Sequence, residues 1–316
     1  MSSQGEAAIG LDLGGTNIKA GLVARDGTVI HRLSLPTEAH RGGEALMDRL
    51  SEIVLALREH AMKHDWRIRG VGVGSAGQVS REKGAVIGAT ANLPGWAGME
   101  LAVRLESRTG LPVAVDNDAN AMAFGEAWAG AGREWRDFVC VTLGTGVGGC
   151  LILDREPYRG RDGFAGEFGH HVVEHGGIPC NCGRTGCWEQ YASVTALMRM
   201  TREIKGEAEL LATPTKVFGS AREGYGPALT LVNEYANYIA IGLANLIHLF
   251  NPQGIVIGGA VTQQGDFLFD RVRGAVAGLL LPVYKDAAEE IPIVPAALGN
   301  DGGVIGAVAG YFIKSD

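Results

Sequence analysis

The segment from Glu167 to Glu189 contains side chains suited to bind a metal ion. One histidine and three cysteines lie close together in it: His170, Cys180, Cys182 and Cys187. One imidazole and three thiolates make the closed tetrahedral Cys₃His set that structural zinc prefers. Gly183 and Gly186 allow the tight turns that bring the thiolates onto one ion. The pattern therefore predicts a structural zinc site.

Spacing alone leaves two alternatives open. A disulfide would leave one of the three cysteines over, and nothing in the sequence marks the chain as secreted. His171 and His175 are also near enough to replace His170 as the fourth ligand. The other two cysteines, Cys140 and Cys150, lie in apolar strand-like runs and are predicted to be buried core thiols.

Two glutamates, Glu167 and Glu189, flank this cluster. A carboxylate accepts hydrogen bonds only, so a pair of them can hold several hydroxyls of a polyol. Each glutamate taken alone is equally consistent with a solvated surface residue. The whole string, E-x-G-H-x₉-C-x-C-G-x₂-G-C-x-E, resembles the zinc- and sugar-binding signature of the ROK family of sugar kinases and repressors. The resemblance implies that Glu167, His170 and Glu189 bind the sugar, and that His170 completes the zinc site.

Length and composition narrow the class of protein. The chain has 316 residues, enough for two domains, and its 48 glycines form short clusters at the ends of predicted strands. The net charge of −7 offers no basic surface for nucleic acid or for an anionic membrane. No signal peptide or long apolar run is visible, and the free thiols favour the cytoplasm.

A glycine turn follows the first predicted strand, Ala8–Leu13. The turn leads into further strands, Ala20–Val23 and Thr28–Leu33, so it is not a Walker loop, which opens a helix. Such a turn is either a plain hairpin or a set of N–H groups facing a phosphate. Asp12 is suited to hold Mg²⁺ through water. The D-x-G-G-T string resembles the first phosphate loop of the actin-like sugar kinases, which implies ATP contacts from Gly14, Gly15, Thr16 and Lys19.

The same design recurs later in the chain. Phe138–Leu143 reads as a strand that is followed by a Gly-Thr-Gly turn and by Cys150–Leu153. A dinucleotide fingerprint would open a helix, whereas this turn leads into a strand. Two hairpins of one design indicate an internal duplication with one phosphate loop in each half. The resemblance implies ATP contacts from the second loop and from the glycines after the strand Gly254–Ile257, namely Gly144, Thr145, Gly146, Gly258 and Gly259.

The D-N-D-A-N string begins at the end of another apolar strand, at Asp116. Residues at the carboxyl end of a strand are well placed for chemistry. A purely structural alternative for Asp118 is a helix N-cap, and a capping residue can also serve in catalysis. The string resembles the catalytic turn of the ROK family, which implies that Asp118 takes the proton of a sugar hydroxyl and that Asn117 binds the sugar. Gly77 and Asn92 are further sugar contacts by resemblance.

Helical periodicity is clearest in residues 44–64 and along the apolar stripe from Val232 to Phe250. Residues 119–129 and 188–204 are also predicted to be helical, and residues 205–226 are predicted to be irregular. The stripe is expected to be core or a subunit contact.

Together these patterns predict an α/β protein of the actin-like ATPase (ribonuclease H-like) fold, with two duplicated lobes and a cleft between them. The expected lobes are residues 1–120, joined by the C-terminal helix at 305–316, and residues 121–304 with the zinc segment. The resemblance implies an ATP-dependent hexose kinase that phosphorylates the 6-hydroxyl of glucose, with Asp118 as general base, Mg²⁺ as cofactor and structural Zn²⁺. A homo-oligomer, dimer or tetramer, is expected.

Two other functions remain open. A kinase of the same family could act on N-acetylmannosamine, N-acetylglucosamine, mannose, fructose or an amino sugar, because the same hydroxyl-binding residues serve several hexoses. A sugar-sensing repressor is the remote alternative. ROK repressors carry a helix-turn-helix domain ahead of the first hairpin, and only eleven residues precede Asp12 here.

Overall fold

A computed structural model describes residues 5–88, 92–204, 210–285 and 290–313. The chain forms two compact units. Unit 1 comprises residues 1–136, 150–166 and 297–316, and unit 2 comprises residues 137–149 and 167–296. Unit 1 therefore continues past residue 120, where the sequence analysis placed the boundary between the expected lobes.

The first sheet has five strands in the order β3-β2-β1-β4-β7. Their bounds are Gly5–Leu13 (β1), Asn17–Ala24 (β2), Val29–Pro36 (β3), Trp66–Ser75 (β4) and Val113–Asn117 (β7). The first three strands are antiparallel neighbours, whereas β1, β4 and β7 run parallel. Asp26 and Gly27 make the turn between β2 and β3, and Gly27 has a φ of 86° there. The predicted strands and hairpins are confirmed in this part of the chain.

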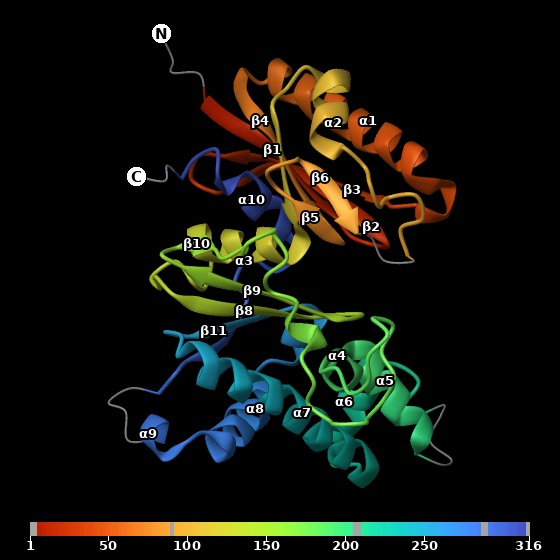
Figure 1. Cartoon of the computed structure of the whole chain (residues 1–316), viewed down its shortest axis with the longest axis vertical. Helices are drawn as coiled ribbons and strands as arrows, with labels where there is room; N and C mark the ends of the chain where they lie inside the picture. The colour runs from red at the N-terminus through yellow and green to blue at the C-terminus, as the bar shows by residue number, and fades with distance from the viewer. Residues whose placement is uncertain (1–4, 89–91, 205–209, 286–289, 314–316) are drawn as a thin grey trace. The chain divides into compact units, whose positions relative to one another are not determined.

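Helices cover both faces of this sheet. Their bounds are Gly42–Lys63 (α1), Leu101–Thr109 (α2), Asp118–Ala129 (α3) and Gly302–Ala309 (α10). Alternate residues of β1 face opposite sides, so Ile9 packs in the core with α1 while Ala8 packs with Val304 of α10. Figure 1 shows α1 and α2 together on one side of the sheet and α10 on the other. Glycine permits the close approach of α10, because a Cβ on Gly72 would lie 1.9 Å from the Ala307 carbonyl oxygen.

The helix α3 belongs to unit 1 although the expected boundary preceded it. Its contact with α10 requires glycine on both sides. A Cβ on Gly306 would lie 1.6 Å from the Ala121 carbonyl oxygen, and one on Gly125 would lie 2.5 Å from that of Gly302. This packing of a middle segment on a C-terminal one explains why a division near residue 120 does not match the compact units.

The second sheet has the order β10-β9-β8-β11-β12. Its strands are Phe138–Leu143 (β8), Val147–Leu153 (β9), Glu156–Pro157 (β10), Ile255–Gly258 (β11) and Ile293–Pro295 (β12). When each sheet's strands are numbered in chain order, both read 3-2-1-4-5. As in the first sheet, the first strand in chain order begins the parallel part, because β11 pairs in parallel with both β8 and β12. The internal duplication predicted from the two glycine hairpins is confirmed by this shared topology.

Unit 2 contains the helices that follow the segment with the predicted zinc ligands. Their bounds are Glu189–Ala192 (α4), Val194–Glu203 (α5), Pro214–Arg222 (α6), Gly226–Phe250 (α7), Asp266–Leu279 (α8) and Pro282–Lys285 (α9). The helix predicted over 188–204 is interrupted at Ser193, whose hydroxyl accepts a hydrogen bond from Ala196 N. The expectation of irregular structure over 205–226 is wrong for α6, which Thr213 caps through Lys216 N. Residues 205–209 of that range lie outside the described residues.

Two smaller elements complete the description. The strands Gln78–Ser80 (β5) and Ala85–Gly88 (β6) form an antiparallel pair in unit 1.

Among the described residues, none of the helices combines the length and the apolar character that a membrane span requires.

Candidate functional site

The carboxyl ends of β1, β4 and β7 bring the predicted catalytic and phosphate-binding residues of unit 1 to one edge. Asp12 pairs with Gly74, and Gly74 pairs with Asp116 on the next strand. Neighbouring strands lie about 4.8 Å apart, so the backbones at Asp12 and Asp116 are separated by about 10 Å. This register places the magnesium candidate and the catalytic turn on the same side of the sheet.

The turn from β7 into α3 is built around Asn117. Its side-chain oxygen accepts hydrogen bonds from Ala119 N at 2.9 Å and Asn120 N at 3.2 Å, so Asn117 is the N-cap. The alternative that Asp118 is the N-cap does not hold, because Asp118 is the first helical residue. The Asn117 amide also donates to the carbonyl oxygen of Gly77 at 3.0 Å. Gly77 has a φ of 102°, which favours glycine.

The first glycine turn joins β1 to β2 and is held from one side by Thr37. Thr37 N donates to the Thr16 carbonyl at 2.8 Å, and its hydroxyl donates to the Gly14 carbonyl at 2.7 Å. Gly15 and Thr16 are exposed, so their N–H and hydroxyl groups are accessible to a phosphate. Asn92 lies beside this turn, because a Cβ on Gly15 would be 4.0 Å from the Asn92 Cβ.

Asp12 lies at the end of β1 against the start of α10. A Cβ on Gly303 would be 2.7 Å from the Asp12 carboxyl carbon. Burial raises the pKa of Asp12, and the positive charge of Lys19 partly offsets this. The Lys19 ammonium donates to the Asn300 side-chain oxygen at 3.2 Å. A desolvated carboxylate near the phosphate turn is suited to a hydrated divalent cation, so the residues present fit magnesium.

The four predicted zinc ligands converge in unit 2. One ligand atom from each of His170, Cys180, Cys182 and Cys187 lies within 4.8 Å of the others. His170 Nδ1 is 3.7 Å from Cys180 Sγ, and the Cys182 and Cys187 sulfurs are 3.6 Å apart. Tetrahedral zinc with bonds of 2.0–2.3 Å places its ligand atoms about 3.5 Å apart. The donor set and its spacing therefore fit zinc, and all five cysteines are free of disulfides.

The backbone around these ligands makes the cluster compact. Cys180 N donates to Arg184 O at 2.8 Å, and Gly183 and Gly186 have φ angles of 86° and 76°. A Cβ on Gly186 would lie 1.7 Å from the Glu174 carbonyl oxygen, so only glycine fits there. Burial and neighbouring sulfurs raise the pKa of Cys187 to about 12, so metal binding by this thiol would release a proton.

The structure distinguishes the neighbouring histidines. His170 directs Nδ1 towards Cys180, and its Nε2 lies 3.9 Å from the Glu167 carboxylate. His171 instead has Nδ1 2.6 Å from the Phe168 carbonyl oxygen, and its ring lies against Trp188. His175 is not among the converging ligand atoms found in the described residues. His170 is therefore the histidine whose two nitrogens face both the cysteines and a predicted sugar ligand.

The second glycine turn, Gly144–Gly146, is tied to the metal-binding segment within unit 2. The Glu189 carboxylate accepts a hydrogen bond from Val147 N at 3.1 Å. A Cβ on Gly146 would lie 2.2 Å from the same carboxylate oxygen. Val194 N donates to Gly144 O at 2.8 Å, so the start of α5 also holds the turn. One predicted sugar ligand thus touches the predicted phosphate loop.

Gly258 and Gly259, at the end of β11, lie next to the end of β8. Gly258 pairs with Thr142 near the end of β8. Gly259 has a φ of 97°, and a Cβ there would lie 2.2 Å from the Leu143 carbonyl oxygen. The close approach leaves a flat backbone surface at the strand end.

Trp188 is a core residue. It is fully buried, and its indole N–H donates to the Tyr238 carbonyl at 2.7 Å. A Cβ on Gly242 of α7 would lie 1.9 Å from the Trp188 ring. The tryptophan therefore fastens the metal-binding segment to α7.

The predicted residues thus form one group in each unit. Unit 1 holds Asp12, the first glycine turn, Gly77, Asn92, Asn117 and Asp118, while unit 2 holds Glu167, the four metal-ligand candidates, Glu189 and the other glycines. Sequence reasoning missed Arg159, which approaches the catalytic turn by binding Asp116. No local motif marks this arginine.

The comparisons with known proteins cover nearly the whole chain. The ROK family model matches residues 8–311. A glucokinase of Thermotoga maritima is 36% identical over 95% of this chain and 96% of its own length. A glucokinase of Streptomyces coelicolor is 37% identical over 95% of each chain.

A solved structure of a similar protein identifies the fold. The ROK glucokinase of Streptomyces griseus, in complex with glucose and AMPPNP, has a TM-score of 0.81 and 34% identity, covering 95% of this chain and 97% of that one. The fold is thus the α/β fold of the actin-like ATPases, with the duplicated sheet order described above. From the family model and these relatives, the chain belongs to the ROK family.

Proposed function

We propose that this protein is an ATP-dependent glucokinase that transfers the terminal phosphoryl group of ATP to the 6-hydroxyl of glucose. The observation that carries the proposal is the shared strand edge, where Asp12 and the Asn117–Asp118 turn stand in register. A phosphoryl transfer site requires a phosphate-binding turn, a magnesium ligand and a carboxylate beside the attacking hydroxyl. Similarity to glucokinases of two bacteria supports glucose as the acceptor.

Asp118 accepts the proton of the 6-hydroxyl, and Asn117 binds the sugar. Because Asn117 makes the helix cap, Asp118 stands in the first turn of α3. A carboxylate near the attacking oxygen orients the hydroxyl and collects its proton as the phosphoryl group moves. The Gly77 carbonyl, which accepts from the Asn117 amide, fixes the rotation of this side chain. Gly77 and Asn92 are the further sugar contacts in this proposal.

The two glycine turns bind the ATP phosphates. Their backbone N–H groups, the hydroxyls of Thr16 and Thr145 and the Lys19 ammonium are the donors. Gly258 and Gly259 form the surface for adenosine. Asp12 would hold magnesium through water, and the bound ion would supply positive charge to the transferring phosphoryl group.

Zinc has a positioning role in this proposal. A histidine that ligates zinc through Nδ1 keeps Nε2 as an N–H donor. In His170 that nitrogen faces Glu167, which lies 3.9 Å away. His170, Glu167 and Glu189 would then hold neighbouring sugar hydroxyls. When bound, zinc would hold His170 in this orientation and would have no chemical role in the transfer step.

The test is a coupled ADP-release assay with MgATP across glucose, mannose, fructose, N-acetylglucosamine and N-acetylmannosamine. We expect glucose to give a kcat/KM at least about tenfold above the next sugar, which corresponds to about 1.4 kcal/mol of discrimination. A higher kcat/KM for an N-acetylated sugar would replace glucose by that sugar and leave the kinase assignment intact. No turnover with any sugar would contradict the kinase assignment.

We further propose that the protein forms a homo-oligomer, a dimer or a tetramer. Large apolar side chains are exposed where the end of α7 meets α9: Leu249 is 72% exposed, Leu281 56% and Val283 67%. The two helices are joined there, because Leu281 N donates to His248 Nε2 at 3.3 Å. Apolar groups gathered at one place favour burial in a subunit contact.

A further inference from the structure

Asp116 lies directly before the catalytic turn and is held by donors on both carboxylate oxygens. Its Oδ1 accepts from Asn117 N at 2.8 Å and from the Asn120 amide at 2.9 Å. Its Oδ2 accepts from Arg159 Nε at 2.8 Å. The Asp116 side chain is only 18% exposed. A carboxylate so far removed from water requires charged or hydrogen-bonded partners.

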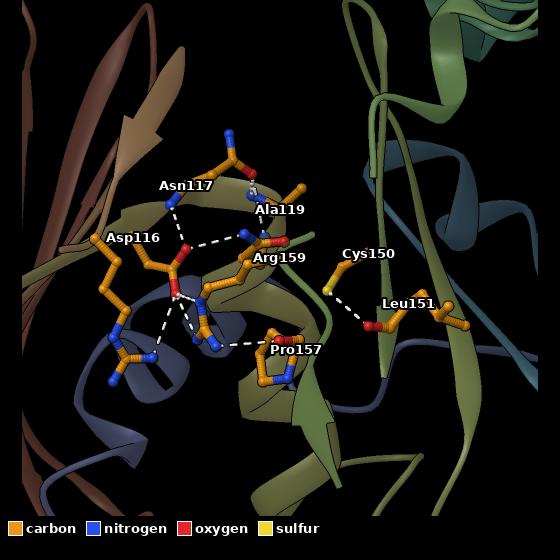
Figure 2. Close-up of polar contacts among 9 residues, drawn as sticks. Asp116, Asn117, Ala119, Cys150, Leu151, Pro157 and Arg159 are labelled. Carbon is orange, nitrogen blue, oxygen red and sulfur yellow. Dashed lines mark hydrogen bonds and ion pairs between the residues drawn. The ribbon is translucent and has the colours of Figure 1, made fainter. Parts of the chain in front are cut away.

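Arg159 follows β10 and is the principal cationic partner of this carboxylate, as Figure 2 shows. Its Nη2 makes an ion-pair contact of 2.7 Å with Oδ2, and its Nη1 donates to the Pro157 carbonyl at 3.0 Å. The Arg159 side chain is 19% exposed. Arg81 is a weaker partner, because it lies 3.8 Å from Oδ2 and is 44% exposed. The planar guanidinium of Arg159 therefore fixes the orientation of Asp116.

The orientation of Asp116 sets the first turn of α3. Asp116 holds the backbone of Asn117 and the side chain of Asn120, which stand on either side of Asp118. Asn117 in turn accepts from Asn120 N, which closes the turn around Asp118. A rotation of the Asp116 carboxylate would break both hydrogen bonds of Oδ1, the one from Asn117 N and the one from the Asn120 amide. The backbone position of Asp118 thus depends on the orientation of the Asp116 carboxylate.

We propose that Arg159 is a positioning residue for phosphoryl transfer, which acts through Asp116 to hold Asn117 and Asp118 in the geometry that the sugar hydroxyl requires. The inference rests on the proposed kinase function. Arg159 touches neither sugar nor ATP in this assignment. Its loss is expected to affect the step that Asp118 serves, and to leave the ATP-binding turns unchanged.

The experiment measures steady-state kinetics of full-length wild type and variants with glucose and MgATP. Arg159→Met is expected to lower kcat by about 10- to 100-fold and to raise the KM for glucose, since misplacement by about 1 Å can cost that much. The KM for MgATP is expected to stay within about twofold. Arg159→Lys keeps the charge without the planar fork, and is expected to recover part of the lost kcat.

The decisive measurement repeats Arg159→Met in an Asp118→Asn background. If Arg159 acts through the base, the double variant keeps kcat within about threefold of Asp118→Asn alone. Arg161→Met is the matched control, because Arg161 lies in the same loop and pairs only with the exposed Asp162 at 2.7 Å in the contacts described. Its kcat is expected to stay within about twofold of wild type.

The possible outcomes separate the two proposals. An active wild type with unchanged kcat in Arg159→Met overturns the positioning role alone. If Arg159→Met lowers kcat by the same factor in the wild-type and Asp118→Asn backgrounds, Arg159 acts on general stability and the positioning role is overturned. A rise in the KM for MgATP as large as the rise in the KM for glucose has the same meaning. If Arg159→Met does not fold, full activity of Arg159→Lys overturns the role. Absence of phosphoryl transfer by the wild type overturns the proposed function, and the positioning role with it.

Discussion

At the start of α3, Asn117 caps the helix and Asp118 is the proposed general base. Asn117 caps the helix and binds the Gly77 carbonyl, and Asp118 occupies the first helical position. Capping by a side chain stabilises a helix by about 1 kcal/mol. Because the cap is made by the neighbouring amide, replacement of Asp118 leaves the N-cap intact. The catalytic role of Asp118 can therefore be tested with little structural disturbance.

Asp118→Asn is expected to lower kcat by about 10²–10⁴-fold, because it removes the proton acceptor. Glucose binding, measured by calorimetry, is expected to remain, since Asn117 and the residues of unit 2 are unchanged. Asp162→Asn, at an exposed position of unit 1, is the control and is expected to retain activity. Turnover close to wild type in Asp118→Asn would remove this residue from the mechanism.

Asp12, the proposed magnesium ligand, lowers the stability of the metal-free fold. Its folded-state pKa is raised by burial, so the folded protein holds the proton more tightly than the unfolded chain does. At neutral pH the ionised carboxylate therefore lowers the stability of the metal-free protein, and this cost shrinks as the pH falls.

Asp12→Asn is expected to raise the Tm of the protein in EDTA by about 2 °C at pH 7.5 and to lower kcat with MgATP at least about tenfold. Thermal scans at pH 7.5 and at a more acidic pH measure the first effect, and the difference is expected to be smaller at the acidic pH. A lower Tm for the variant in EDTA would show that the Asp12 carboxylate stabilises the metal-free fold.

At the scale of elements, the segment with the proposed zinc ligands and the second glycine turn are in direct contact within unit 2. Glu189 begins α4 and binds Val147 N, and α5 begins with Val194, which binds Gly144 O. Trp188 anchors the same segment on α7. A change in the conformation of the Gly144–Gly146 turn is therefore expected to move Glu189, a predicted sugar ligand, through direct contact.

Gly146→Ala tests this link, because its Cβ would lie 2.2 Å from the Glu189 carboxylate. We expect the dissociation constant for glucose, measured without ATP, to rise by about tenfold. Gly144→Ala is the matched control in the same turn, since a Cβ there meets no atom within 4 Å among the described residues. It is expected to leave glucose binding unchanged. Equal effects of the two variants on glucose affinity would contradict the link.

Removal of one thiol tests the zinc assignment. Cys182→Ala is expected to lose one equivalent of zinc per chain and to raise the KM for glucose at least about tenfold, because the segment that carries His170 loses its support. Metal analysis and steady-state kinetics measure the two effects. Cys150→Ala removes a buried thiol outside the cluster and is expected to keep the zinc. Full activity of zinc-free protein would refute a positioning role for the metal.

At the scale of the whole molecule, the proposed homo-oligomer can be tested by substitution of exposed apolar side chains. Leu249→Glu is expected to shift the oligomer to smaller species in light scattering, because a charge would enter an apolar contact. Met62→Glu is the control, since Met62 of α1 is 67% exposed and lies in the other unit. If both variants keep the mass of the wild type, the surface where α7 meets α9 is not the contact.

The repeated sheet order also explains which features of the fold were predictable. Each strand–turn–strand hairpin is a local pattern of apolar runs and glycines, so β1, β2, β8 and β9 were found within a few residues of their bounds. The helix α1 was found because Leu46, Leu50 and Leu57 recur on one face and are buried. By contrast, α6 depends on its Thr213 cap in a charged stretch and was missed.

By itself, the sequence determined the zinc-ligand candidates, the two glycine turns, the candidate catalytic turn and the duplication, because these depend on residue types at short spacing. The tertiary structure decided which histidine faces the cysteines, which residue caps α3 and where Trp188 lies. It also brought Arg159 to Asp116 across 43 positions and Lys19 to Asn300 across 281. Such contacts arise from packing of distant segments, and no local pattern in the chain specifies them.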